Sequence, residues 1–384
     1  MAQPVTLAQA VDAAWRRATE SAAVQGALQR AQAESAASSA WWAAPPSLEI
    51  AQRMDRGLSG TGARETEVGI AMPLWLPGQR AARQQLMATD LEVARLQGAA
   101  GRWQVAGMVQ ASLAEVHLRS SELVQHQTEA TALESLGRDV ERRVKAGELA
   151  PVDALAAQAE WLQADVRVSQ AAEQLAQARL HWRSLTGLDS EPAFDDVPMA
   201  SASAQTQLAE HPVLREARQR VEASARKLDL AQASRRSTPE LVVRVRQDQG
   251  NSGDVAVNSW GIALRIPFGT DDRQQPLLAA ALSERDLADA QSRQLQQQVA
   301  AAVEAQVLTQ DALERQWRSE QRRATLLRER SDLMGKSFRA GETALPDLLR
   351  ALAAAHAAEA AVQKLYRQRA QAAARHQHAL GVIP

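Results

Sequence analysis

The sequence lacks cysteine, has few aromatic side chains and carries almost no net charge. None of its 384 residues is Cys, which excludes a disulfide framework, a thiolate metal site and a cysteine nucleophile. The 44 Lys and Arg residues are balanced by 45 Asp and Glu, and a net charge of −1 excludes a generally basic nucleic-acid binder. No run of 18 apolar residues occurs, so the sequence predicts no transmembrane helix.

The residues that are present favour long helices. Hydrophobic residues make up 45% of the chain but aromatic residues only 3%, and much of the apolar content is Ala. Such a composition favours helices that pack at close range rather than a compact core of large side chains. Residues 1–7 contain no basic segment followed by an apolar one, so no secretion signal is expected there. Both a cytoplasmic chain and a mature exported chain whose signal was replaced by Met1 fit this N-terminus.

The first part of the chain predicts a helix followed by a β-hairpin. Helical spacing over 5–40 ends before Pro45 and Pro46, which fix φ and remove backbone donors. Apolar and polar residues then alternate over 47–56 and again over 65–74, on either side of a Gly- and Ser-rich loop. This alternation predicts two strands of one hairpin.

A long helical hairpin follows. Residues 79–145 contain no proline and predict a helix of about 100 Å, a length typical of coiled coils. Three glycines within it predict a local bend or break: Gly98, Gly101 and Gly107. A tight reversal at Ala146–Pro151 leads into a helix over 151–187, whose apolar residues recur with coiled-coil spacing.

The whole plan then repeats. A linker over 188–205 separates a first repeat, 1–187, from a second, 206–384. The second repeat predicts a helix over 206–236, strands over 239–248 and 255–267, and helices over 273–339 and 345–380. An offset of about 194 residues superimposes the two halves, because Ala146-Gly147-Glu148 then meets Ala340-Gly341-Glu342 and Pro73 meets Pro267. One register across strand, helix and reversal indicates a tandem repeat.

The strands permit two interpretations. At about 9–11 residues each, they have the length of tilted membrane-spanning β-strands. Four strands cannot close a barrel and open edges cannot lie in lipid, so a spanning sheet requires several chains. In a spanning sheet, the apolar face would suit lipid. The other face would suit a water-filled lumen, because that face carries Glu49, Arg53, Asp55, Glu67, Arg244, Arg246 and Arg265. Two amphipathic hairpins on a soluble domain explain the alternation equally well.

The order of these features resembles the TolC-type outer-membrane factor family. The resemblance covers about 5–380 and is carried by the tandem plan, by Met72-Pro73-Leu74-Trp75-Leu76-Pro77-Gly78-Gln79-Arg80 and by the paired reversals. Within the family, the short chain and the run ending at Arg80 look most like the CzcC-like channels of heavy-metal efflux systems.

The resemblance implies a homotrimer in the bacterial outer membrane that extends into the periplasm. Three chains would contribute twelve strands to one barrel and twelve long helices to a tunnel. Such a channel is a passive conduit, not an enzyme. It takes substrate, here heavy-metal cations, from an inner-membrane RND pump through a periplasmic adaptor. Its partners are thus further copies of the chain, the adaptor, the pump and outer-membrane lipid, without nucleic acid or a cofactor.

The resemblance also assigns roles to the reversals. They would form the periplasmic tip where the adaptor docks, through Lys145, Ala146, Gly147, Glu148, Arg339, Ala340, Gly341 and Glu342. Asp347 matches an acidic residue that narrows the tunnel into a gate, and Asp153 matches a residue that holds the closed tip together in some members. Where some members have a second Asp, this chain has Arg350, which would neutralise part of an Asp ring. Lys145 and Arg339 have Asp153, Asp347, Glu148 and Glu342 as acidic partners within reach.

Several alternatives remain. Asp153 and Asp347 also suit the role of helix caps after each turn. Trp41, Trp42, Trp75 and Trp260 lie near strand ends, as membrane-interface residues or as packing residues. His376 and His378 point apart on a helix, and the other histidines are scattered, so no metal site is predicted. A drug, organic-solute or type I secretion channel is the alternative substrate class, and a soluble coiled-coil scaffold is the alternative class of protein.

Overall fold

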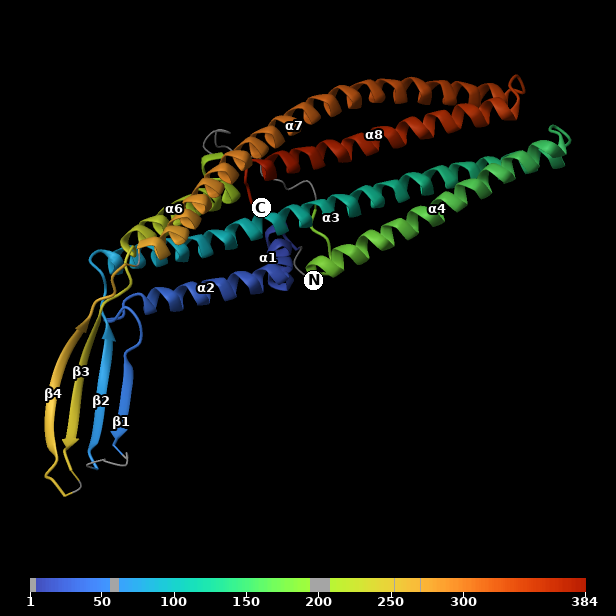
Figure 1. Ribbon diagram of the computed structural model, residues 1–384. Coiled ribbons are helices and arrows are strands. Elements are labelled where there is room, and N and C mark those ends of the chain that lie inside the picture. Colours follow the sequence, from blue (N-terminus) through green and yellow to red (C-terminus); the bar gives the residue numbers. More distant parts are fainter. Residues whose placement is uncertain (1–4, 56–61, 194–207, 252, 270) are drawn as a thin grey trace. The chain divides into compact units, whose positions relative to one another are not determined.

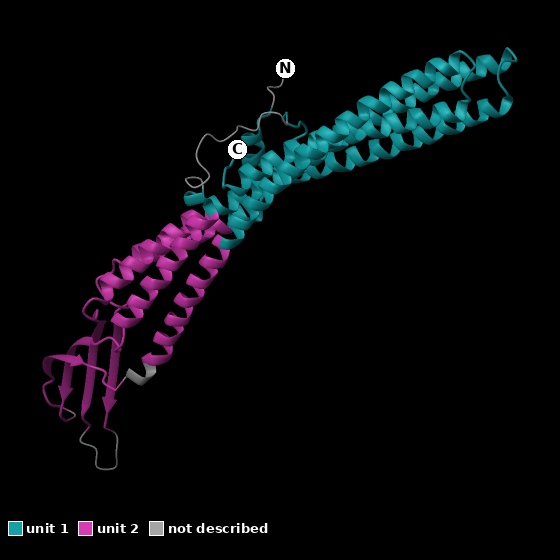
Figure 2. Ribbon diagram, turned by 90° about the horizontal axis from the view of Figure 1, so that it is seen from above, with its two compact units in different colours: residues 1–22, 99–212, 297–384 teal, residues 23–98, 213–296 magenta. Residues whose placement is uncertain are grey.

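The computed structural model describes residues 5–55, 62–193, 208–251, 253–269 and 271–384 (Figure 1). The chain forms two compact units (Figure 2). Unit 1 comprises residues 1–22, 99–212 and 297–384, and unit 2 comprises residues 23–98 and 213–296. Each unit therefore combines segments from both halves of the sequence, because corresponding parts of the two repeats pack together.

The described residues form long helices and one antiparallel sheet, as the sequence predicts. The two longest helices are α3 (Gln79–Lys145) and α7 (Asp271–Arg339), with 67 and 69 residues. Each is followed by a second helix that returns along it, α4 (Pro151–Thr186) and α8 (Leu345–Ala379). The shorter helices are α1 (Leu7–Arg17), α2 (Thr19–Ala37) and α6 (Pro212–Ala233). No helix within the described ranges is long and apolar enough to cross a membrane.

The four strands join the two repeats into a single sheet in unit 2. They are β1 (Ser47–Met54), β2 (Arg64–Pro73), β3 (Glu240–Gln249) and β4 (Val257–Arg265), in the order β1-β2-β3-β4. Both hairpins were expected from the sequence, but the antiparallel pairing of β2 with β3, from Arg64 opposite Gln249 to Pro73 opposite Glu240, was not. Most of the first hairpin loop and of the 188–205 linker lies outside the described residues.

The single helix expected over 5–40 is wrong, because the chain breaks at Ala18. This residue has extended backbone angles, φ −68° and ψ 136°, and α1 ends before it while α2 begins after it. Ala18 is 194 residues before Pro212, the first residue of α6. The second repeat therefore marks the break with a proline, whereas the first repeat has an Ala that intrinsic helix propensity alone would place inside a helix.

The break expected in α3 at its glycines is wrong, since the helix is continuous from Gln79 to Lys145. The glycines instead allow neighbouring side chains to approach the helix closely. A Cβ on Gly101 would lie 3.0 Å from the Trp15 ring, and one on Gly107 would lie 2.7 Å from the His378 ring. On Gly98 it would lie 3.3 Å from the Val24 side chain.

Two clusters of buried side chains hold unit 1 together. The larger cluster joins α1, α3, α4 and α8 around Val11, Val109, Leu113 and Trp182. The smaller cluster lies near the ends of both helical hairpins and joins them through Val140, Ala157, Phe338, Leu345 and Leu348. The two hairpin ends are thereby fixed to each other by apolar contact within one chain.

A pair of glycine substitutions in α3 tests this packing. Gly107→Ala should lower the free energy of unfolding by about 1–3 kcal/mol, because the new methyl group overlaps the His378 ring. Gly137→Ala is the matched control, since no atom lies within 4 Å of the position that its Cβ would take, and it should raise stability by about 0.5–1 kcal/mol. Denaturant unfolding followed by circular dichroism measures both changes. Equal effects of the two substitutions would contradict the close contact.

Candidate functional site

The sheet presents an apolar face that nothing in the described chain covers. The register aligns side chains of the same kind across all four strands, as in Ile70 opposite Val243 and Val243 opposite Ile262. Large apolar side chains on this face are strongly exposed, including Leu48 (64%), Ile50 (69%), Ile70, Val245, Trp260 (78%), Ile262 and Leu264. An exposed apolar surface of this extent indicates an interaction with lipid or with another protein.

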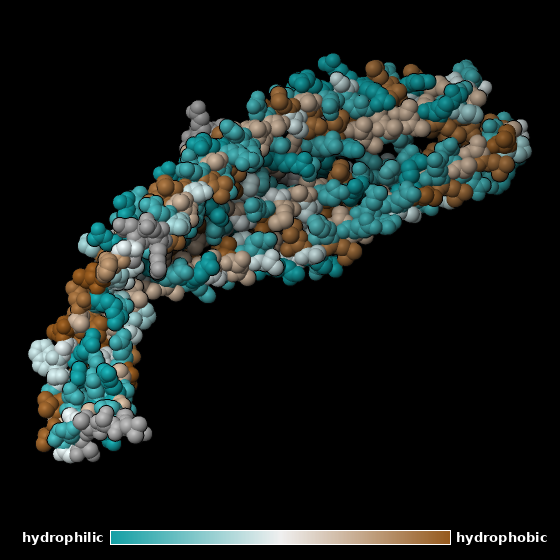
Figure 3. Space-filling model, viewed as in Figure 1, coloured by the Kyte–Doolittle hydropathy of each residue, from teal (hydrophilic) through white to brown (hydrophobic). Residues whose placement is uncertain are grey.

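The opposite face of the sheet carries charges that are paired between strands. Arg244 lies 2.8 Å from Glu67, Arg246 lies 3.1 Å from Glu65, and Arg265 lies 2.8 Å from Glu240. Between these ion pairs the face is lined by small residues such as Gly69 and Gly261, across which the Arg244 side chain extends. In Figure 3, hydrophilic side chains cover the visible face of the strands and hydrophobic ones emerge at its borders.

The two edges of the sheet have no strand partner among the described residues. β1 pairs only with β2, and β4 pairs only with β3. Each edge strand therefore presents backbone N–H and C=O groups that can pair with another strand. Of the tryptophans near the strand ends, Trp75 donates through Nε1 to the Ala40 carbonyl at 3.2 Å, whereas Trp41 is 85% exposed.

The two hairpin reversals have the same backbone geometry. Gly147 and Gly341 adopt φ of +76° and +79°, in the left-handed region that glycine tolerates best. The N–H of Glu148 donates to the Arg143 carbonyl and that of Gly147 to the Val144 carbonyl. The corresponding bonds form at Glu342 and Gly341, so both helices end in a Schellman motif.

The acidic residues after the turns have different partners. Asp153 accepts a hydrogen bond at Oδ2 from the Ala150 N–H, at 3.3 Å, and so caps the start of α4. Asp347 occupies the corresponding position of α8, but its Oδ1 lies 2.6 Å from the Arg350 guanidinium. The sequence places an Arg three residues after the second Asp, and the structure joins the two in an ion pair one turn apart.

The basic residues before the turns do not reach these carboxylates. Lys145 pairs at 3.0 Å with Glu141, one turn earlier on the same helix, rather than with an acid across the turn. The i,i+4 neighbour is favoured because both side chains already lie on one helix face. Arg339 forms no ion pair within the described residues, and Glu342 accepts a long hydrogen bond of 3.4 Å from Ser337 Oγ.

A buried histidine pair in unit 1 was not singled out from the sequence. His378 stacks on the Trp103 ring with the ring centroids 4.3 Å apart, and His211 meets the edge of the same ring at 4.9 Å. Trp103 Nε1 donates to the His378 carbonyl at 2.8 Å, and His378 Nε2 donates to the Trp103 carbonyl at 2.9 Å. His211 is 1% exposed, and neither ring nitrogen has a hydrogen-bond partner in the described part of the chain.

This environment favours the neutral form of both histidines. Burial, and secondarily the neighbouring His378, lowers the pKa of His211 from 6.5 to about 4. Burial also lowers the pKa of His378, and its hydrogen bond to Trp103 opposes that shift. The pair is therefore part of the packed core. Within the described ranges, no group of three or more His, Asp or Glu side chains gathers closely enough to hold a metal ion.

A cluster of charged side chains lies in unit 2. Lys227 of α6 lies 2.5 Å from Glu284 of α7, and Asp90 of α3 lies half-buried beside them. Burial, followed by the repulsion of Glu34 and Glu284, raises the pKa of Asp90, and Lys227 opposes the increase. Four helices thus bring their charges together where one lysine faces three carboxylates.

Comparison with known proteins places this arrangement among solved membrane-channel structures. No family model and no curated protein sequence matches the chain. The outer-membrane protein VceC of Vibrio cholerae superimposes with a TM-score of 0.79 at 16% identity, over 98% of this chain and 96% of that one. The fold is that of TolC-type outer-membrane channels.

Two further structures agree with this likeness. The CmeC outer-membrane channel of Campylobacter jejuni has a TM-score of 0.78 at 12% identity, over 99% of this chain and 89% of that one. The open state of the MtrE outer-membrane channel of Neisseria gonorrhoeae has a TM-score of 0.74 at 16% identity, over 98% and 88%. At these identities the likeness establishes the fold, and the activity of this chain rests on its own residues.

The buried histidine predicts acid-sensitive stability. The folded-state pKa of His211, about 4, lies below the value of about 6.5 expected for an unfolded histidine. The unfolded chain therefore binds more protons between these values, and the free energy of unfolding falls as the pH drops from 6.5 to 4, by up to about 3 kcal/mol. His378 acts in the same direction.

Replacement of His211 by Phe should remove part of this dependence, because the new ring keeps the contact with Trp103 and does not titrate. Denaturant unfolding at pH 7.5 and at pH 4.5 measures the effect, with the exposed His181 changed to Phe as the control. An unchanged pH dependence in His211→Phe would show that His211 titrates normally.

Proposed function

We propose that the chain is one subunit of a trimeric outer-membrane channel, a passive conduit and not an enzyme. The observation that carries the proposal is the two-faced sheet with two open edges. An apolar face and a charged face on the same strands suit a wall between lipid and water. Because lipid does not tolerate open edges, β4 of one copy must pair with β1 of the next until the sheet closes. Three copies supply twelve strands.

The fold supports the same conclusion. The similar structures VceC, CmeC and MtrE are described as an outer-membrane protein and as outer-membrane channels. In this chain the long helices would continue from the barrel as a periplasmic tunnel. The chain then belongs to the TolC-type outer-membrane factors, and receives substrate from an inner-membrane RND pump through a periplasmic adaptor.

We further propose heavy-metal cations as the transported substrate. Support comes from the Met72–Arg80 run, which resembles CzcC-like channels. Loss of the chain should then sensitise its host to divalent heavy metals, and complementation should restore tolerance. Sensitisation to organic drugs alone would favour the alternative substrate class.

The adaptor would dock on the two reversals, from Lys145 to Glu148 and from Arg339 to Glu342. The Schellman turns give both loops the same rigid shape, so an adaptor can meet two similar surfaces on each chain. We also assign the constriction to Asp347 and Arg350, with Asp153 holding the start of α4. In a trimer, three Asp347–Arg350 pairs would surround one axis and leave little net charge there.

A pair of substitutions in β4 tests the membrane assignment. Ile262→Arg places a charge on the apolar face and should cost about 2–4 kcal/mol of insertion energy, so the chain should fail to reach the outer-membrane fraction. Ser259→Arg, on the opposite face of the same strand, is the control and should insert normally. The protein is produced with a secretion signal and its mass is measured in mild detergent. A water-soluble monomer or dimer without pore activity, unaffected by either change, would instead support the scaffold alternative.

The proposed constriction predicts opposite changes in ion selectivity. Arg350→Ala removes the cation from each pair and should shift the reversal potential of single pores toward cation selectivity. Asp347→Ala should shift it toward anions and raise conductance. Planar-bilayer recordings under a salt gradient measure both. Identical selectivity in wild type and both variants would place the constriction elsewhere.

A further inference from the structure

Helix α4 carries two apolar seams on opposite sides. Its inner seam consists of Ala157, Ala164, Ala171 and Ala178, which are buried and recur every seven residues. Its outer seam consists of Leu155, Leu162, Val166 and Leu180, whose exposed fractions are 67%, 49%, 55% and 61%. At about 100° of rotation per residue, the outer seam faces away from the inner one. Heptad-spaced leucines on an exposed face are typical of a helix that lacks its packing partner.

Helix α7 repeats this arrangement. Its inner seam, at Ala324, Ser331 and Phe338, is buried at seven-residue intervals. Its outer seam contains Leu308, Leu326 and Leu333, which are 64%, 67% and 57% exposed. The outer seams lie on the sides of α4 and α7 that face away from the core of unit 1, and the described residues of one chain leave them exposed.

The two outer seams have the same spacing from the hairpin ends. α4 starts from its turn at Pro151 and α7 reaches its turn at Arg339. At 1.5 Å per residue, Leu162 and Leu326 lie about 16 and 20 Å from those ends. Leu180 and Leu308 lie about 44 and 46 Å from them. The turns themselves are level, because the end cluster packs Ala157 against Phe338 and Leu345.

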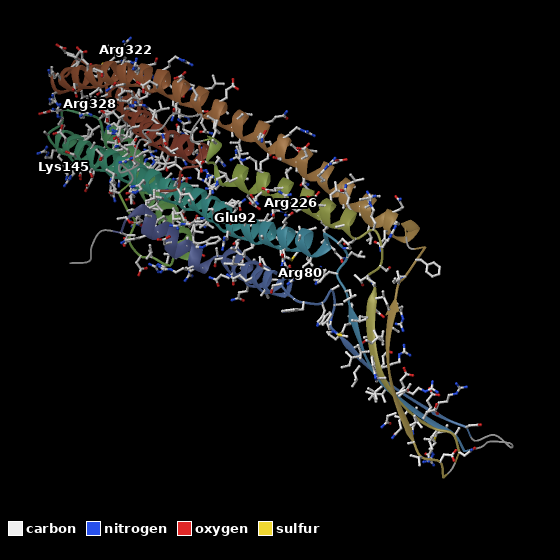
Figure 4. The ribbon with its side chains drawn as sticks, turned by 90° about the vertical axis from the view of Figure 1, so that its left-hand side faces the viewer. Arg80, Glu92, Lys145, Arg226, Arg322 and Arg328 are labelled. Carbon is white, nitrogen blue, oxygen red and sulfur yellow. The ribbon has the colours of Figure 1, made fainter. Side chains whose placement is uncertain are left out.

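The charged residues between the apolar groups of the two outer seams also lie at matching distances from the turns. Glu173 lies in the outer seam of α4 about 33 Å from its turn, and Arg315 lies in the outer seam of α7 about 36 Å from its turn. Neither forms an ion pair within the described part of the chain, and Glu173 accepts only a hydrogen bond from Gln177, at 3.0 Å. Arg322 also lies on the outer side of α7, about 26 Å from its turn (Figure 4). The outer seam of α4 therefore presents an acid, Glu173, at the height where the outer seam of α7 presents a base, Arg315.

We propose that the outer seam of α4 packs antiparallel against the outer seam of α7 from a second copy of this chain. The inference rests on the proposed trimer, in which a closed ring joins one flank of each copy to the opposite flank of the next. Leu162 then contacts Leu326, Leu180 contacts Leu308, and Glu173 pairs with Arg315. The shared pattern of apolar, charged and apolar groups sets the register.

Cysteine cross-linking tests the register directly, because the chain has no cysteine of its own. The double variant Leu162→Cys/Leu326→Cys should form disulfide-linked dimers and trimers in detergent-extracted protein under mild oxidation. The mismatched control Leu162→Cys/Leu308→Cys places the thiols about 30 Å apart along the seam and should remain uncross-linked. The matched pair should give at least tenfold more covalent trimer.

A charge exchange provides the second test. Glu173→Arg and Arg315→Glu should each lower the temperature at which the trimer dissociates, and the double variant should recover the wild-type temperature. Additive losses in the double variant would overturn the pairing.

The outcomes separate this inference from the proposed function. A native trimer that does not cross-link at the matched pair, or that cross-links equally at the mismatched pair, overturns the seam contact and leaves the channel in place. A wild-type chain that is monomeric after export and extraction overturns both.

Discussion

The open-edged sheet is the constraint on which the rest of the structure depends. The sheet of a single chain has one apolar face and two unpaired edges. The described residues neither cover the apolar face nor pair with the edges. The pairing of β2 with β3 already uses the inner edges of both hairpins, so among the described strands only β1 and β4 keep an unpaired edge. On the charged face, by contrast, Arg244, Arg246 and Arg265 are satisfied within the chain, since each pairs with a carboxylate on the same sheet.

The tandem repeat explains why the same helix-ending turns appear twice. The hairpin ends close with identical Schellman bonds at Gly147 and Gly341, and the far ends of α4 and α8 are followed by Gly187 and Gly381, which also have positive φ and are also 194 residues apart. The repeats diverge where packing differs. At Gly187 a Cβ would meet the exposed Arg17, whereas at Gly381 it would meet the buried His211. One repeat thus leaves a charge at the surface where the other packs a neutral ring.

Local features could be predicted from the sequence, and contacts between distant segments could not. The strands, the long helices and both turns follow from alternation, from the absence of proline over 79–145 and from Gly147 and Gly341. The pairing of β2 with β3 joins residues more than 160 positions apart, and nothing in either strand alone specifies it. The glycines of α3 do not break the helix, and a glycine that admits a ring and a glycine that breaks a helix look the same in a sequence. The break at Ala18 left a signal, since the 194-residue offset aligns it with Pro212.

The candidate site could likewise be predicted only in part from the sequence, as the residues at the hairpin ends show. The sequence places Arg350 three residues after Asp347 on one helix, a spacing that allows the ion pair seen in the structure. The sequence did not predict that Lys145 pairs with Glu141, because an acid across the turn and an acid one helical turn earlier are both close in sequence. His211 and His378 are 167 positions apart, and their burial around Trp103 depends on the packing of α3 against α8 and the start of α6.

The two seams of α4 illustrate a general requirement for a ring of helices. A helix in an ordinary bundle needs one apolar stripe, but a helix in a closed ring has a neighbour on each side and needs two. In α4 the inner stripe is built of Ala and the outer of Leu and Val. Small residues allow close approach within the chain, where the connecting turn already holds the helices together. In the proposed trimer, larger residues give more apolar contact between separate copies, where no covalent link assists. One apolar stripe is enough for a helix that packs only within a hairpin. The second stripe of α4 and of α7 therefore exceeds what a soluble helical hairpin requires.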